Sequence, residues 1–139
     1  MKAFLWTKDL STGLVEVDRH NSYLCSVIEE FVALKSTQEN KSDFYILLTQ
    51  ILEYASNCFK IEELYLEHMS FPRLKAHSLE HNAFKKKMIN SIEFLKDNYD
   101  SKFINDTKVF LRFWLRYHIG ESDVSFKNYK QKFTFSLGL

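Results

Sequence analysis

The sequence predicts an all-α protein folded as an up-down-up-down four-helix bundle, with an extended N-terminal arm and a short C-terminal helix. Only three glycines and one proline occur among 139 residues, which leaves little turn chemistry for a many-stranded β protein. Apolar residues recur at spacings of three and four in four long segments, and short polar runs separate these segments. The length suits one domain, spanning residues 1–139.

Residues 1–17 show no helical periodicity, so we expect an arm that packs over the domain. The first helix is expected to start near Arg19 with Asp18 as its N-cap, because an aspartate can accept the free N–H groups of a first turn. The polar run 36–42 follows it as a loop. The predicted buried stripe of this helix consists of His20, Leu24, Val27, Ile28, Phe31 and Leu34.

The second helix is expected from Asp43 to about Glu67, with Ser42 as its N-cap. Pro72 opens the third helix, since the missing N–H of proline would be unpaired in a first turn. The buried stripe of the second helix holds Leu47, Leu48, Ile51, Ala55, Cys58, Glu62 and Tyr65. That of the third holds Leu74, His77, His81, Phe84, Met88, Ile92 and Leu95.

The fourth helix is expected from about Phe103 to Ile119, and Gly120 is expected to end it. Its inward residues are Thr107, Leu111, Trp114, Leu115 and His118. A last short helix starting at Ser122 or Asp123 would carry Phe126, Tyr129 and Phe133.

Charge and composition exclude several classes of function. The net charge of +1 gives no electrostatic footprint for nucleic acid or an anionic membrane. No apolar run approaches the roughly 20 residues that span a bilayer, and the N-terminus is charged too early for a signal peptide. Two cysteines are too few for a disulfide framework. We therefore expect a cytoplasmic protein without nucleic-acid or membrane partners.

Metal-competent side chains gather at one end of the predicted bundle. Residues four apart on a helix project side by side, as in the pairs Cys58–Glu62 and His77–His81. In an antiparallel bundle, the starts of helices one and three meet the ends of helices two and four. Unpaired polar groups are costly to bury, and histidine with carboxylate suits a first-row transition metal. The candidate ligands are His20, Cys58, Glu62, His77, His81, His118 and Asp123.

The pattern of these residues resembles the hemerythrin family, specifically its single-domain bacterial members. The resemblance runs from Trp6 to about Tyr129, nearly the whole chain. It is carried by Trp6 and Gly13, D18-R-H20, C58-F-K-I-E62-E63, F71-P72 followed by H77-x-x-x-H81 and Phe84, and W114-L-x-x-H118-I-x-x-x-D123. Five separated motifs in the right order make it specific.

The resemblance implies a non-haem di-iron site that binds or senses O2 or a similar diatomic ligand, and a binding protein rather than an enzyme. It implies that His77, His81 and His118 hold one iron. It also implies that His20, together with a histidine at position 58, holds the second iron and that Glu62 and Asp123 bridge the two. The apolar pocket for O2 would be formed by Phe59, Trp114, Leu115 and Ile119.

Cys58 departs from the family pattern, and three outcomes follow from it. The thiolate can itself ligate iron, as soft-ligand preferences permit. A neutral thiol would leave the second iron loosely held. Loss of the second iron would leave a mononuclear centre with three histidines. A weakened or remodelled site is favoured over a faithful copy, and we expect His68 on the surface rather than in the vacant position.

Other interpretations explain fewer residues. H77-S-L-E80-H81 fits the H-x-x-E-H pattern of inverted zinc metallopeptidases, but that class accounts for neither Glu62 nor His118. Ferritin-like di-iron bundles need Glu-x-x-His, which is absent here. The remaining alternatives are a remodelled metal centre with a redox, peroxide- or NO-reactive or enzymatic role, and a metal-poor interaction module. We expect a monomer or a weak homo-oligomer.

Overall fold

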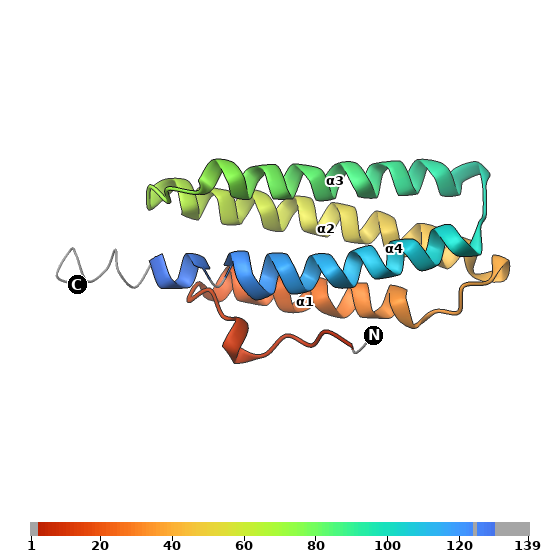
Figure 1. Ribbon diagram of the computed structural model, residues 1–139, viewed down its shortest axis with the longest axis horizontal. Helices are drawn as coiled ribbons and strands as arrows, with labels where there is room; N and C mark the ends of the chain where they lie inside the picture. The colour runs from red at the N-terminus through yellow and green to blue at the C-terminus, as the bar shows by residue number, and fades with distance from the viewer. Residues whose placement is uncertain (1–2, 124, 130–139) are drawn as a thin grey trace.

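Four antiparallel helices form the protein, as the ribbon of the computed structural model shows (Figure 1). The structure describes residues 3–123 and 125–129. The bundle consists of α1 (Val15–Ala33), α2 (Lys41–His68), α3 (Leu74–Asp97) and α4 (Ser101–Trp114). No strand occurs among the described residues, so the predicted all-α class is confirmed.

Short segments complete the chain. Two 3-10 turns, η1 (Lys8–Leu10) and η2 (Gln38–Asn40), precede α1 and α2 respectively. A π-helix, η3 (Leu115–Asp123), continues directly from α4. Residues 125–129 are helical, in keeping with the expected short C-terminal helix, whereas Phe133 lies outside the described residues.

The N-terminal arm runs back along α1, as Figure 1 shows in red. Phe4, Trp6 and Leu10 pack against the core, and the backbone N–H of Phe4 donates to Glu29 Oε1 at 3.1 Å. Near the entry to α1, Gly13 has a φ of 83°, a region that side chains rarely adopt. The arm is therefore fastened over one face of the bundle.

Two predicted helix ends are wrong. The first helix starts at Val15, and its N-cap is Leu14 rather than Asp18. Asp18 lies inside the first turn, where its carboxylate accepts hydrogen bonds from the backbone N–H and the hydroxyl of Thr12, at 2.7 and 2.8 Å. It ties the arm to the helix instead of capping it.

Gly120 does not end the fourth helix either, because the chain passes through it as part of η3. Its backbone does not take the positive φ of a helix-terminating glycine, since Gly13 is the positive-φ glycine of the described chain. The second and third helices start at Lys41 and Leu74, each two residues from the predicted start.

The core fills the space between the four helices and contains most of the predicted stripe residues, together with Phe44, which was on no predicted stripe. Ile28 and Phe31 from α1 meet Phe44 and Ile51 from α2, and all four are fully buried. A smaller cluster of Leu66, Phe71 and Phe126 closes the end of the bundle at the α2–α3 turn. That end is where Figure 1 shows α1 beginning and α4 ending.

None of the helices in the described residues combines the length and the apolar character needed to cross a membrane. The cytoplasmic location and the monomeric or weakly associating state stay predictions.

Candidate metal centre

A polar cluster interrupts the apolar core near the α2–α3 turn. Glu62 comes from the end of α2, and His77 and His81 come from the start of α3. His118 and Asp123 come from η3. All five side chains are buried, at no more than 4% exposure each. These are five of the seven ligands that the sequence predicted, and the structure brings them together.

The ligating atoms of this cluster converge on one point. One such atom from each of Glu62, His77, His81 and His118 lies within 4.8 Å of the others. The Nε2 atoms of His81 and His118 are 3.0 Å apart, and His81 Nε2 is 3.4 Å from Glu62 Oε1. The His77 ring contacts Glu62 through Nε2. Asp123 Oδ1 lies 3.2 Å from His77 Nε2 and 3.5 Å from His118 Nε2.

The π-helix explains how η3 supplies two of these groups. His118 and Asp123 are five residues apart, which would place them about 140° apart around an α-helix. A π-helix closes its hydrogen-bonded rings between residues i and i+5, so residues five apart share a face. Both side chains therefore point inward, and π-helical turns are frequent at functional sites in general.

Two carboxylates outside the cluster hold its histidines in position. Glu63 Oε2 accepts from His81 Nδ1 at 2.9 Å, and Glu80 Oε2 accepts from His118 Nδ1 at 2.8 Å. Ser78 donates to Glu63, and Ser122 donates to the second oxygen of Glu80 at 3.1 Å. Carboxylates in this position fix the tautomer and orientation of metal-binding histidines.

The role of Glu63 and Glu80 was not predicted from the sequence. Each lies one position away from a candidate ligand, Glu62 or His81, and therefore about 100° round its helix. In a bundle that direction is not solvent but the next helix. A carboxylate beside a buried ligand, on the flank that faces a neighbouring helix, was the signal that could have found them.

The hydrogen-bond pattern fits a cation at the centre of the cluster. A carboxylate can only accept, so Nδ1 carries the proton in both His81 and His118. In the neutral rings both Nε2 atoms then present lone pairs to each other at 3.0 Å. In addition, buried Asp123 Oδ1 has no hydrogen-bond partner. A first-row metal ion at about 2.0–2.2 Å from such atoms would satisfy all of them.

Without a metal, protons must provide the positive charge. Burial lowers the pKa of His77, but the adjacent carboxyl groups of Asp123 and Glu62 outweigh this and raise it to about 10. Burial opposes ionisation of Glu62, yet its contact with His77 and the neighbouring histidines hold the pKa of that carboxyl below its usual range. Burial and the nearby Glu62 charge raise the pKa of Asp123. The cluster therefore holds an ion pair of at least one carboxylate and one imidazolium.

Aromatic rings enclose the cluster on its core side. Phe59 stacks on His81 with ring centroids 3.9 Å apart and planes 3° from parallel. Trp114 stacks on His118 at 4.6 Å and 11°. Leu115 and Ile119 are fully buried in the same apolar core as Phe59 and Trp114. Two of the four residues predicted to form an apolar pocket, Phe59 and Trp114, thus stack on the histidines, and the pocket itself stays a prediction.

The first helix contributes a different residue from the one predicted. His20 is not part of the converging group, and its ring packs edge-on against Tyr54 at 5.7 Å. The neighbouring Asn21 is buried and donates from Nδ2 to Asp123 Oδ2 at 2.8 Å. The expectation that His20 reaches the cluster is therefore wrong, and the next residue, Asn21, reaches it instead.

Cys58 is buried in the core one turn before Glu62, as a free thiol. Its Sγ is not among the atoms that converge within 4.8 Å. Burial and the nearby Glu62 raise the pKa of this thiol to about 12. His68 is exposed, as expected.

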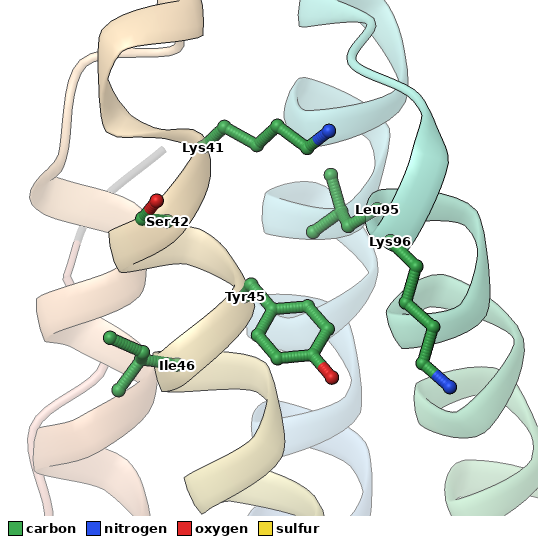
Figure 2. Close-up of a pocket in the computed structure, with 6 residues that line it drawn as sticks. All are labelled: Lys41, Ser42, Tyr45, Ile46, Leu95 and Lys96. Carbon is green, nitrogen blue, oxygen red and sulfur yellow. The ribbon is translucent and has the colours of Figure 1, made fainter.

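A surface pocket lies at the opposite end of the bundle. Figure 2 shows Lys41, Ser42, Tyr45 and Ile46 of α2 facing Leu95 and Lys96 of α3 around it. No histidine, cysteine or carboxylate lines it, so the pocket offers no metal ligand. The buried cluster is therefore the stronger candidate for a functional site.

The chain is similar to known proteins both in sequence and in fold. No family model matches the chain. A bacteriohemerythrin of Clostridium acetobutylicum is 29% identical over 129 residues, which cover 86% of this chain and 95% of that protein. A crystal structure of wild-type hemerythrin superposes with a TM-score of 0.78 at 20% identity, covering 91% of this chain and 97% of that chain. A crystal structure of a leucine-to-phenylalanine mutant gives 0.79 at 20% identity, covering 92% and 97%.

Proposed function

We propose that the chain belongs to the hemerythrin family, that it binds non-haem iron at this cluster, and that it uses the iron to bind or sense O2 or a similar diatomic ligand. The observation that carries the proposal is the facing pair of imidazole nitrogens on His81 and His118, 3.0 Å apart. Their other nitrogens are committed to Glu63 and Glu80. Two neutral rings placed in this way direct their lone pairs at each other, and a shared proton or a metal ion between them relieves the repulsion.

Each residue has a distinct role in this proposal. His77, His81 and His118 hold the metal together with Glu62 and Asp123. Ferrous iron would supply the electron density that a diatomic ligand accepts when it binds. Phe59 and Trp114 stack on two of the three rings and keep water out, so that a small apolar ligand has a dry place to bind. A binding or sensing role needs no general base, and we propose it in preference to catalysis.

Loading with Fe(II) under anaerobic conditions tests the proposal. We expect iron to remain with the protein after desalting, and the absorption spectrum to change reversibly when O2 is admitted and removed. His81→Ala should lose the iron, whereas His68→Ala, which alters an exposed histidine on α2, should keep it. Circular dichroism of both variants establishes that they remain folded.

Two results would refute the proposal in different ways. Retention of no iron by the wild-type protein would remove the metal centre itself. Retention of iron with a spectrum that is indifferent to O2 and to NO would leave a metal-binding protein without the proposed ligand.

A further inference from the structure

The side of the cluster that faces α1 has no histidine directed at it. The group that reaches Asp123 from this side is the amide of Asn21, a residue only 5% exposed. Cys58 lies one turn before Glu62 on α2, and its sulfur stays outside the converging group. His20, the one histidine of α1, packs on Tyr54 instead.

The two oxygens of Asp123 therefore have different surroundings. Oδ1 faces His77 and His118 at 3.2 and 3.5 Å and has no hydrogen-bond partner. Oδ2 accepts the amide hydrogen bond of Asn21 at 2.8 Å. A carboxylate that bridges two metals must offer one oxygen to each of them. In this chain the second oxygen is already occupied by a donor that cannot bind a metal, since an amide N–H has no lone pair to give.

The donor set divides in the same way. Three imidazoles and the Glu62 carboxylate converge within 4.8 Å, and Asp123 Oδ1 lies 3.2 and 3.5 Å from two of these imidazoles. This donor set suffices for one transition-metal ion. On the other side of Glu62 and Asp123, a second iron would need nitrogen ligands. Within the described chain, the amide of Asn21 and the buried sulfur of Cys58 stand there instead. The residues thus fit one iron and do not fit the pair that the family resemblance implied.

We propose that this chain holds a single metal ion, bound by His77, His81, His118, Glu62 and Asp123, and that Asn21 is a positioning residue that keeps Asp123 from bridging to a second metal. The proposal rests on metal binding as proposed above, and it specifies that centre as mononuclear. Five protein donors leave room for one small ligand on a six-coordinate ion.

Metal stoichiometry tests the proposal without any assay of activity. The protein is loaded anaerobically with excess Fe(II) and desalted, and iron per chain is measured by mass spectrometry of the metal against amino-acid analysis. We expect one iron per chain. After oxidation, that iron should account fully for the strong paramagnetic resonance signal of isolated ferric ions, which a coupled ferric pair does not give.

The outcomes separate this inference from the proposed function. Two irons per chain, or a resonance signal that accounts for little of the bound iron, would overturn the mononuclear centre and leave iron binding intact. No bound iron would overturn both. The double variant Asn21→His with Cys58→His supplies nitrogen ligands on the α1 side and should raise the stoichiometry to two. If it stayed at one, Asn21 and Cys58 would not be what closes the second position.

The positioning role of Asn21 has its own readout. Co(II) bound in place of iron reports ligand geometry through its visible spectrum. Asn21→Ala frees Asp123 Oδ2 and should change that spectrum, whereas His20→Ala at the adjacent position should leave it unchanged. Identical spectra for Asn21→Ala and the wild-type protein would overturn the assigned role.

Discussion

Replacing Glu80 by glutamine tests how far the outer carboxylates determine metal affinity. Glu80 accepts from His118 Nδ1 at 2.8 Å and from Ser122 at 3.1 Å, and Gln keeps its shape while it removes the charge. Loss of such a partner costs about 10- to 100-fold in metal affinity. Because the Glu80 side chain is 28% exposed, solvent screens part of its charge, and we expect the lower figure, about tenfold or 1.4 kcal/mol.

A second carboxylate allows the reasoning to be checked for consistency. Glu63 holds His81 as Glu80 holds His118, and its side chain is similarly exposed, at 31%. Because the two carboxylates act on different imidazoles, Glu63→Gln combined with Glu80→Gln should weaken binding by about 100-fold if the two effects add.

Competition against a chelator of known affinity measures these changes. Glu121→Gln is the matched control, since Glu121 is exposed on the same π-helix as His118. Thermal unfolding of the metal-free variants should show little change, because neither substitution removes apolar packing. Equal affinities for the wild-type protein, Glu80→Gln and Glu121→Gln would refute the positioning argument.

Other expected outcomes follow from charge and burial. Because the pKa of His77 is raised to about 10, metal uptake at about pH 7 should displace the proton on this ring. A pH indicator in weak buffer should register at least one proton released per chain. Metal uptake without proton release would contradict the ion pair described above. Burial raises the pKa of both Cys25 and Cys58 to about 12, so the folded state keeps protons that the unfolded state loses above about pH 9. The free energy of unfolding should therefore fall as pH rises through this window, by up to about 1.4 kcal/mol per pH unit for each thiol, and urea titrations of Cys25→Ala should show one thiol's share missing from that slope. Glu29 and Arg112 form a bidentate ion pair between α1 and α4, with contacts of 3.1 and 2.7 Å. Glu29→Gln should lower the free energy of unfolding by about 1.5–3 kcal/mol in chemical denaturation. An unchanged denaturation midpoint would show that the pair does not stabilise the fold.

Most of the fold was predictable because its determinants are periodic. Apolar positions spaced by three and four specify which face of each helix is buried, and fully buried Phe31, Ile51 and Met88 lie on the predicted stripes. The pair His77 and His81 was predictable for the same reason, since residues four apart share a face. Short connections then bring the ends of neighbouring helices together.

The α1 contribution was not predictable from periodicity. His20 lies four residues before Leu24 and Asn21 lies three before it, so both positions suit the same apolar stripe. Ligand chemistry favoured the histidine. The helix, however, begins at Val15, and its inward face follows Val17, Asn21 and Leu24, all of which are buried. Adjacent positions on a helix point about 100° apart, so this difference directs Asn21 rather than His20 toward the cluster.

The π-helix could not be predicted, because glycine is the usual signal for a helix end and Gly120 was interpreted that way. Its backbone instead continues the helix, and a side chain added there would meet nothing within 4 Å. No local signal separates a glycine that stops a helix from one that a helix passes through.

The wide turn of η3 also bears on how the chain tolerates changes in length. An α-helix that gained one residue between His118 and Asp123 would have to rotate one of them away from the cluster, unless the surplus residue were absorbed locally. A π-turn accommodates the extra residue, because each of its hydrogen-bonded rings contains one residue more than the ring of an α-turn. A spacing of five in a π-helix and a spacing of four in an α-helix are therefore comparable ways to place two side chains on one face, and η3 uses the spacing of five for His118 and Asp123.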